Sequence, residues 1–279
     1  MPGLLTPADV RRLLADHGLA PHKALGQNFV VDPNTVRKVV RAADLKPGDL
    51  VVEVGAGLGS LTVALRAAGA RVVAVEVDAG MVRALGDVVG ADPDVTIVHA
   101  DALTSDFGAL TGGQPAAFVA NLPYNVATPI IMTALLSGTF HDLLVMVQKE
   151  VGLRWVARVG DPLYAGVSVK VAALAEAALA GSISRNAFYP VPNVDSVLVR
   201  LRPGSVPEMA EAGDRQALFE VVDSAFRQRR KRLRNALATP QRSPVSVEAA
   251  LQAAGLAAGA RAEELDLDAF ARLTAALRR

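Results

Sequence analysis

Cysteine is absent from this sequence of 279 residues, and histidine occurs only four times. Without thiols the chain can form neither disulfides nor thiolate metal sites. The histidines, His17, His22, His99 and His141, are scattered and show no spacing typical of metal ligands. We therefore expect no bound metal.

The sequence also lacks any apolar run of about 18 residues that could cross a membrane as a helix. Its first residues do not resemble a signal peptide, because Asp9, Arg11, Arg12 and Asp16 lie among them. We expect a cytoplasmic protein that has no membrane partner.

A strong net charge is missing as well, since the formal value of +1 does not by itself indicate a nucleic-acid partner. Residues 227–234 (RQRRKRLR) nevertheless carry six cations in eight positions. A local basic patch matters more for binding nucleic acid than the total charge does. On a helix, one face would present Arg227, Arg230, Lys231 and Arg234, which we predict to bind RNA. The alternative is an ordinary solvated helix face.

The chain is 51% hydrophobic and 20% charged, and its length suits one large domain and one small one. Residues 203–214 (PGSVPEMAEAGD) form the best linker, because they hold two prolines and two glycines. We predict a catalytic domain over residues 1–202 and a small all-helical domain over residues 203–279. The helices expected in the second domain cover residues 215–238, 246–257 and 266–278.

Short apolar runs alternate with helical patterns through the first domain. The expected strands cover residues 50–54, 71–77, 95–98, 116–120 and 143–147. Such alternation predicts a mostly parallel sheet with helices on both faces, which is a Rossmann-like α/β fold.

A glycine-rich turn, Gly55–Gly59 (GAGLG), follows the first of these strands, and Glu76 ends the second strand 21 residues after Gly55. In such units the glycines let a ligand approach the backbone, and the acid binds ribose hydroxyls. Asp101, after the third strand, could contact an adenine amine or cap a helix. The pattern predicts a site for a ligand that carries adenosine.

The segment Asn121-Leu122-Pro123-Tyr124 follows the fourth strand. The Asn121 amide oxygen and the Leu122 carbonyl could accept the two hydrogens of an exocyclic amine. Pro123 fixes the direction of that carbonyl, and the Tyr124 ring could stack on a planar base. The alternative is a loop that a proline ends, with a half-buried tyrosine.

Eight segments carry a family resemblance: LGQNFVVD (25–32), VVEVGAGLGSLT (51–62), VEVD (75–78), DAL (101–103), NLPYNVATP (121–129), VQKEV (147–151), FYPVPNVDSVLVRL (188–201) and FRQRRKRLRNAL (226–237). On these segments the sequence resembles the small-subunit rRNA adenine dimethyltransferases, the KsgA (RsmA) family, over nearly its whole length. It departs from the family's usual pattern at Val30, where leucine is common, and at Ala56, where proline is common.

The resemblance implies a class I methyltransferase fold with S-adenosylmethionine as the methyl donor. It also implies a monomer that forms N6,N6-dimethyladenine at two adjacent adenines in the 3′-terminal hairpin loop of small-subunit rRNA, within a pre-ribosomal 30S particle. The donor contacts that it implies are Asn28, Val30, Gly55, Gly57, Glu76, Asp101 and Asn121. Catalysis would fall to Asn121, Leu122, Pro123 and Tyr124, with Phe188 either stacking on the other face of the base or packing in the core.

One segment gives conflicting signals, because residues 163–180 favour a helix by propensity whereas the family implies a strand within residues 175–184. We follow the resemblance there.

Three other functions stay open. The first is a resistance methyltransferase of large-subunit rRNA, although those enzymes more often carry isoleucine at the position of Leu122. The second is a non-catalytic RNA-binding assembly factor. The third is a nicotinamide-dependent oxidoreductase, which the glycine-rich turn alone would suit but which leaves the Asn121–Tyr124 segment unexplained.

Overall fold

A computed structural model describes residues 3–21, 26–204 and 212–278 of the chain. Contacts divide the chain into two compact units, of which the first comprises Met1–Gly152 and Ala178–Pro203, and the second comprises Leu153–Ala177 and Gly204–Arg279. Most of the predicted linker lies outside the described residues, because residues 205–211 are not among them.

A seven-stranded sheet forms the centre of the first unit, with the strand order β4-β3-β2-β5-β6-β9-β7. The strands from β4 to β6 are parallel, and β9 is antiparallel to β6. This arrangement confirms the predicted sheet, and β7 settles the conflict over residues 175–184 in favour of a strand. The bounds are β2 Leu50–Val54, β3 Arg71–Glu76, β4 Val95–His99, β5 Ala116–Asn121, β6 Phe140–Gln148, β7 Ala175–Ile183 and β9 Ser196–Pro203.

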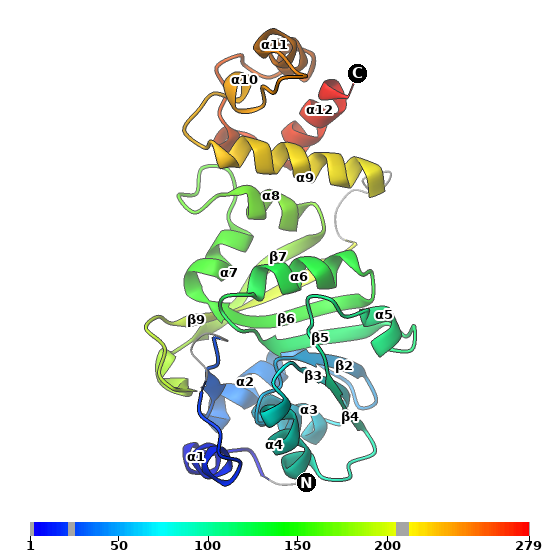
Figure 1. Cartoon of the computed structure of the whole chain (residues 1–279), viewed down its shortest axis with the longest axis vertical. Coiled ribbons are helices and arrows are strands. Elements are labelled where there is room, and N and C mark those ends of the chain that lie inside the picture. Colours follow the sequence, from blue (N-terminus) through cyan, green and yellow to red (C-terminus); the bar gives the residue numbers. More distant parts are fainter. Residues whose placement is uncertain (1–2, 22–25, 205–211, 279) are drawn as a thin grey trace. The chain divides into compact units, whose positions relative to one another are not determined.

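Helices cover both faces of the sheet, with α2, α3 and α4 on one side and α6 on the other (Figure 1). Strand residues alternate between the faces: Val51, Val72 and Ala74 pack with the helices of the first side, whereas Phe107, Phe118 and Phe140 form edge-to-face ring contacts elsewhere. The helices of this unit include α1 Pro7–Asp16, α2 Pro33–Ala43, α3 Ser60–Ala67, α4 Ala79–Val89, α5 Phe107–Leu110 and α6 Ala127–Leu136.

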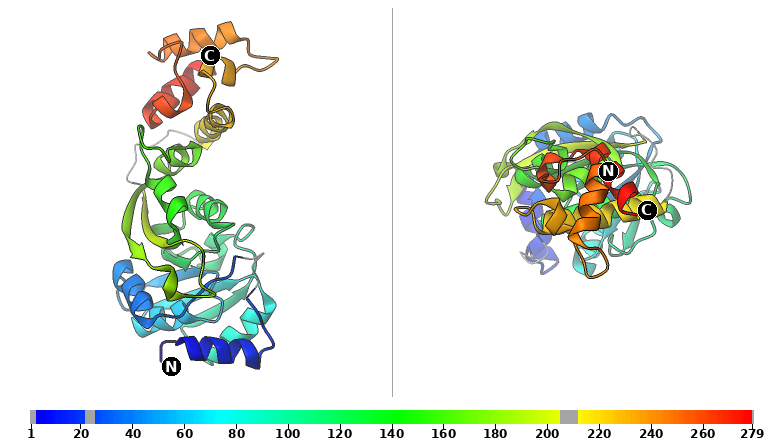
Figure 2. Two further views of the ribbon diagram at one scale, coloured as in Figure 1. Left: turned by 90° about the vertical axis from the view of Figure 1, so that its left-hand side faces the viewer. Right: turned by 90° about the horizontal axis from the view of Figure 1, so that it is seen from above.

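Polar caps define where these helices begin. Thr6 is the N-cap of α1 and forms a capping box with Asp9. Asp32 and Asp78 cap α2 and α4 in the same manner by accepting backbone N–H groups. Helix α1 lies beside α4 (Figure 2), where His17 Nε2 is 3.2 Å from Asp87.

The order of the strands creates a crevice between β2 and β5. From β2 the chain proceeds to β3 and β4 on one side, and it returns to place β5 on the other side of β2. Loops at such a switch point diverge, and ligands of open α/β sheets bind there, at the carboxyl ends of the strands. The glycine-rich turn after β2 and the Asn121–Tyr124 segment after β5 therefore meet at this crevice.

A second, two-stranded sheet was not expected from the sequence. It pairs β1 (Phe29–Val30) with β8 (Phe188–Tyr189), in antiparallel register, and the Val31 N–H extends the pairing by donating to the Ala187 carbonyl at 2.8 Å. This sheet joins the segment around Asn28 to the segment that leads into β9.

The second unit is helical, with α8 Gly166–Ala172, α9 Ala212–Arg227, α10 Leu233–Ala236, α11 Pro244–Ala253 and α12 Leu267–Leu277, while α7 (Lys149–Val156) crosses the division. It takes in more of the chain than the predicted domain of residues 203–279. The reason is that Tyr164 and Val169 belong to the same core as Leu218 and Phe270. The Tyr164 hydroxyl also donates to the Leu265 carbonyl at 2.7 Å.

The prediction of one continuous helix over residues 215–238 is wrong, because the chain leaves the helix between α9 and α10. Helix α9 ends at Arg227, residues 228–231 form turns, and Arg232 is extended and bridges to Arg261. Crowded like charges weaken a helix, and the buried Leu233 is held elsewhere, because its N–H donates to the Ala260 carbonyl at 2.8 Å. The basic residues therefore do not share one helix face.

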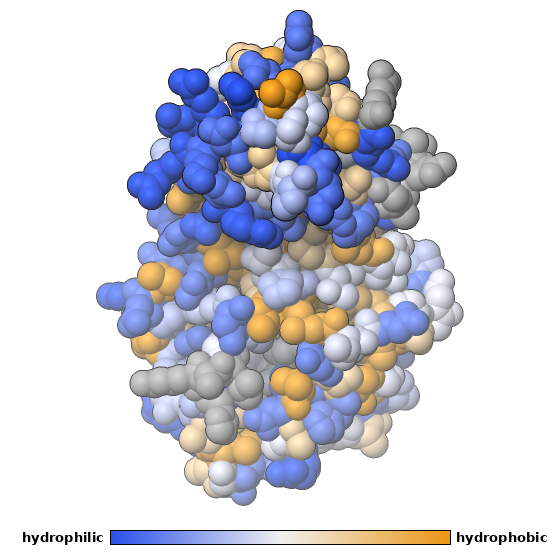
Figure 3. All heavy atoms as spheres, turned by 45° about the horizontal axis from the view of Figure 1, so that its top comes forward, coloured by the Kyte–Doolittle hydropathy of each residue, from blue (hydrophilic) through white to orange (hydrophobic). Residues whose placement is uncertain are grey.

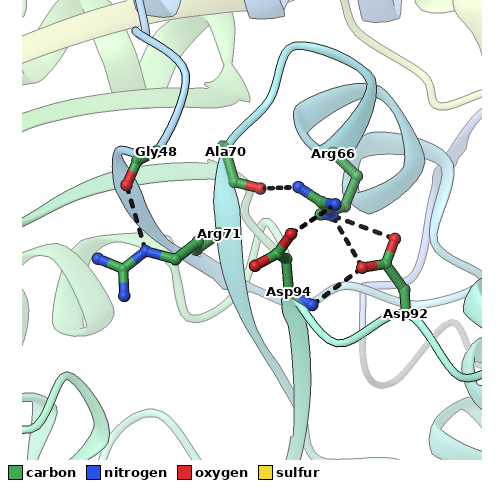
Figure 4. Close-up of polar contacts among 6 residues, drawn as sticks. All are labelled: Gly48, Arg66, Ala70, Arg71, Asp92 and Asp94. Carbon is green, nitrogen blue, oxygen red and sulfur yellow. Dashed lines mark hydrogen bonds and ion pairs between the residues drawn. The ribbon is translucent and has the colours of Figure 1, made fainter.

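A part-buried ion-pair cluster ties α3 to the strands beside it (Figure 4). Arg66, near the end of α3, donates to the Ala70 carbonyl at 2.6 Å and lies 3.2 Å from Asp92 and 2.9 Å from Asp94. Its side chain is 15% exposed. Since Ala70 precedes β3 and the two carboxylates precede β4, the cluster fixes α3 and, at the other end of that helix, the glycine-rich turn.

Replacing Arg66 with methionine should lower the melting temperature by about 5–10 °C, because two carboxylates and a carbonyl lose their partner. Arg71→Met is the matched control, since Arg71 is exposed and bonds to the Gly48 carbonyl (Figure 4) and to Gln114. It should cost less than about 2 °C. Thermal unfolding followed by circular dichroism measures both, and equal losses would contradict the role of the cluster.

Candidate active site

A cavity of about 220 Å³ lies at the carboxyl ends of the central strands. The structure brings together there every residue predicted to contact the donor, and the Asn121–Tyr124 segment as well. The predicted residues in its lining are Asn28, Val30, Gly55, Gly57, Glu76, Asp101, Asn121, Leu122, Pro123 and Tyr124.

Two glycines of the glycine-rich turn adopt a backbone conformation that disfavours a side chain. Gly55 and Gly57 have positive φ values of 73° and 55°, which residues other than glycine rarely adopt. A Cβ on Gly55 would lie 3.4 Å from Pro123 Cδ, and one on Gly57 would lie 3.1 Å from the Phe29 ring. The turn therefore packs directly against the Asn121–Tyr124 segment and against β1.

Glu76 is buried at the end of β3, and its carboxylate accepts three backbone hydrogen bonds. Oε2 accepts from the Gly57 N–H at 2.8 Å, and Oε1 accepts from the N–H groups of Val77 and Asp78 at 2.9 and 3.0 Å. A carboxylate has about four acceptor positions, so one remains available to a ligand hydroxyl. The bond to Gly57 also holds the glycine-rich turn against this acid.

The Asn121 side chain is oriented by one hydrogen bond. Its Nδ2 donates to the Asn28 carbonyl at 2.9 Å, and Asn28 in turn donates from its own Nδ2 to the Gly26 carbonyl at 3.0 Å. Because a carbonyl can bond only to the nitrogen of the amide, the Asn121 oxygen must face the other way. Within the described residues no donor binds that oxygen, so it can accept a hydrogen bond from a ligand amine.

Tyr124 is half-buried and lines the same cavity. Its hydroxyl lies 2.9 Å from Ser196 Oγ. Burial raises the pKa of Tyr124, and the hydrogen bond with Ser196 opposes that shift. The ring is thus a neutral, anchored surface.

Asp101 closes a turn rather than capping a helix, and the residue also lines the cavity. Its Oδ1 accepts from the Leu103 N–H at 2.9 Å, as in a turn cap. The residue is nevertheless exposed and lines the cavity next to Leu103. The remaining carboxylate oxygen is available to a ligand.

Glu53 and Ser60 are among the cavity residues that the sequence analysis did not single out. The only signal for Glu53 was a single acid inside an apolar strand. It is 2% exposed, and its Oε2 accepts from Thr62 Oγ1 at 2.6 Å. Ser60 Oγ is buried and has no hydrogen-bond partner in the part of the chain that the structure describes.

Two groups of predicted site residues lie elsewhere. Phe188 is 2% exposed and packs in the core of the first unit, outside the cavity lining, which matches the alternative of core packing. The pairing of β8 with β1, which was not expected from the sequence, places this ring there. The basic run belongs to the second unit.

The chain matches known proteins over nearly its whole length. The family model described as "Ribosomal RNA adenine dimethylase" matches residues 18–278. The chain belongs to this family. Ribosomal RNA small subunit methyltransferase A of Thermobifida fusca is 50% identical to it over 276 residues, which cover 97% of this chain and 95% of that protein. The protein of the same name from Streptomyces coelicolor is 49% identical over 278 residues, with coverages of 97% and 96%.

Solved structures agree with this family. The 23S rRNA methyltransferase ErmE is 28% identical to this dimethylase, with a TM-score of 0.65 over 90% of this chain and 100% of that chain. A dimethyladenosine transferase from Plasmodium falciparum shares the fold, with a TM-score of 0.71 at 24% identity over 87% of this chain and 94% of that chain. The predicted class I fold, the resemblance to the small-subunit enzymes and the S-adenosylmethionine-dependent activity are confirmed.

The cavity of this dimethylase fits S-adenosylmethionine. Glu76 offers an acceptor to ribose hydroxyls, and Asp101 offers one to the adenine amine. The unpartnered Ser60 hydroxyl supplies one further polar group in the wall. In the described residues no helix is long and apolar enough to cross a membrane.

Burial raises the pKa of Glu53 to about 8, while the Thr62 hydroxyl opposes the shift and the Glu76 charge adds to it. An unfolded glutamate titrates near pH 4.3. Between these values the folded protein holds one more proton than the unfolded chain does, so its free energy of unfolding falls as the pH rises through this window.

In the absence of donor, the free energy of unfolding should fall by about 2 kcal/mol between pH 6 and pH 8. Glu53→Gln should remove it, because the amide keeps an acceptor for Thr62 but does not ionise. Urea denaturation at the two pH values measures the difference. Replacing the exposed Glu176 with glutamine is the control and should leave the fall intact. An unchanged pH dependence in Glu53→Gln would rule out a neutral Glu53.

Proposed function

We propose that this dimethylase forms N6,N6-dimethyladenine at two adjacent adenines in the 3′-terminal hairpin loop of small-subunit rRNA, within a pre-ribosomal 30S particle and as a monomer. The observation that carries the proposal is the Asn121 amide, whose oxygen is left to accept from an adenine amine in the cavity that also holds Glu76. Relatives about 50% identical carry the small-subunit name, against 28% for the 23S rRNA enzyme ErmE. This difference supports the small subunit as the substrate.

The target amine needs activation, because its lone pair is delocalised into the adenine ring. Hydrogen bonds from its two N–H groups to Asn121 Oδ1 and the Leu122 carbonyl favour a pyramidal nitrogen with a directed lone pair. These bonds strengthen as positive charge develops on the nitrogen, so they stabilise the transition state more than the ground state. Bound S-adenosylmethionine supplies a methyl group that its positively charged sulfur already activates.

Hydrogen bonds hold the backbone of the Asn121–Tyr124 segment, which would face the target adenine. The Leu122 N–H donates to the Met146 carbonyl at 3.1 Å, and the Val126 N–H donates to the Pro123 carbonyl at 3.2 Å. The adenine must leave its stack to reach this site, and the Tyr124 ring then supports one of its faces. Positioning of this kind accounts for much of the rate that such an enzyme needs.

Part of the basic run of the second unit is suited to bind the rRNA backbone. Arg227, Arg230, Lys231 and Arg232 are exposed and form no ion pair with any described residue. Arg229 and Arg234 are instead paired with acids: Arg229 Nε lies 2.7 Å from Glu263, and Arg234 Nε lies 3.2 Å from Glu248.

Many residues at the surface of the C-terminal helices are hydrophilic (Figure 3). Unpaired cations repel one another, and phosphates relieve that repulsion. We therefore assign phosphate binding to Arg227, Arg230 and Lys231. Arg234, predicted to bind RNA, is engaged with Glu248 instead.

Asn121→Ala should lower kcat at least about 100-fold, because bonds that tighten in the transition state are lost, while RNA binding stays within about twofold. Methyl transfer to unmodified small-subunit particles and a binding assay on the same particles measure the two effects. Glu76→Ala is the contrasting variant, which should weaken donor binding at least about tenfold. An Asn121→Ala enzyme with normal turnover would contradict the proposed chemistry.

The double variant Arg230→Gln/Lys231→Gln should weaken binding to small-subunit particles and flatten its salt dependence, by about 0.7–0.9 in log–log slope for each phosphate that the variant no longer binds. The matched control is Arg229→Gln/Arg234→Gln, which also removes two charges but from residues that already have acidic partners. Titrations at several salt concentrations measure both. Donor affinity should not change, since none of the four residues lines the cavity. If both double variants show the same salt-dependence slope, Arg230 and Lys231 do not bind phosphates.

A further inference from the structure

The hydroxyl of Ser196 has no role in the chemistry above, although the residue lies within one of the segments that carry the family resemblance, FYPVPNVDSVLVRL (188–201). Ser196 is completely buried, and its Oγ lies 2.9 Å from the hydroxyl of Tyr124, 72 positions away in the sequence. We propose that Ser196 is a positioning residue, which holds the far end of the Tyr124 ring in place through this hydrogen bond. The inference rests on the proposed role of Tyr124 as the surface on which the target adenine stacks.

Ser196 is itself held by the sheet. It is the first residue of β9 and pairs with Gln148 of β6. The preceding residue, Asp195, accepts two hydrogen bonds. Its carbonyl accepts from the Lys149 N–H at 2.9 Å, and its carboxylate accepts from the Arg185 N–H at 2.9 Å. The Ser196 hydroxyl therefore has a fixed position from which to orient another group.

Tyr124, in contrast, follows β5 in a loop. Close packing fixes its backbone, since a Cβ added to Gly26 would lie 3.2 Å from the Tyr124 nitrogen. Its ring could still rotate about two side-chain bonds, because the cavity lies on one side of it. A hydrogen bond at the far end of the ring restricts rotation about the Cα–Cβ bond, because that rotation would move the hydroxyl away from Ser196. The ring is thereby ordered before the base arrives, which removes an entropy cost from the reaction.

A simpler interpretation is that each of the two hydroxyls merely satisfies the other's hydrogen-bonding capacity in a buried place. The two interpretations differ in a measurable manner. A merely structural bond affects stability and leaves turnover unchanged in the folded enzyme. A positioning bond affects turnover, and it does so only through Tyr124.

The test uses the full chain with S-adenosylmethionine and small-subunit particles that lack the modification. Ser196→Ala, Tyr124→Phe and the double variant each remove the same bond. Each should lower kcat by about three- to tenfold, and the double variant should lose no more than either single one. Donor affinity by calorimetry should stay unchanged in all three.

Thr111→Val is the control for loss of a buried hydroxyl elsewhere, since Thr111 Oγ1 donates to the Phe107 carbonyl at 3.1 Å within the first unit. It should lower the melting temperature and leave kcat unchanged. If Ser196→Ala does not fold, Tyr124→Phe alone tests the bond from its other end.

Normal turnover in Tyr124→Phe would overturn the proposal, as would losses from Ser196→Ala and Tyr124→Phe that multiply in the double variant. Tyr124→Ala separates this outcome from a failure of the proposed function. Full turnover in Tyr124→Ala would contradict stacking itself, whereas a loss there combined with normal turnover in Ser196→Ala would contradict only the positioning role.

Discussion

The hydrogen bond from Asn121 Nδ2 to the Asn28 carbonyl joins residues that are 93 positions apart, and the chemistry of the cavity depends on it. It turns the amide oxygen of Asn121 toward whatever the cavity holds. Other features make this bond possible. The strand order brings the end of β5 beside the end of β2, and Gly26 leaves room for the loop that follows Tyr124, since a Cβ there would lie 2.9 Å from Asn125 Oδ1. One bond thus connects the segment that faces the donor with the segment that faces the target.

Much of the first unit could be predicted from the sequence, because its signals are local. A buried parallel strand is a continuous apolar run, and the residue that ends it, such as Glu76 or Asn121, lies at the edge of the sheet where ligands bind. These site residues were therefore accessible from motifs and spacing, whereas Asn28 and Val30 were implied only by the family resemblance. The strand over Ala175–Ile183 was not accessible in this manner, because its helical propensity is overridden by pairing within the sheet.

The errors have a common physical cause, which is contact between distant parts of the chain. The sequence allows Phe188 to be a stacking ring, but the pairing of β8 with β1 places it in the core. The sequence of the basic run predicts half of a helix. In the structure, Leu233 bonds to Ala260, while Glu263 and Glu248 pair with two arginines of the run. Glu53 became notable only through its burial beside Thr62. Within each unit, function is thus set by tertiary partners that spacing along the sequence does not reveal.

The account makes one central claim: this dimethylase modifies adenines of the small subunit through the Asn121–Tyr124 segment. The most direct measurement incubates the purified protein and S-adenosylmethionine with small and large ribosomal subunits that lack N6,N6-dimethyladenine, and then locates the modified nucleotides by mass spectrometry of rRNA fragments. The account predicts two adjacent dimethyladenines in the 3′-terminal hairpin loop of small-subunit rRNA. Dimethyladenine in large-subunit rRNA, or in neither, would contradict it.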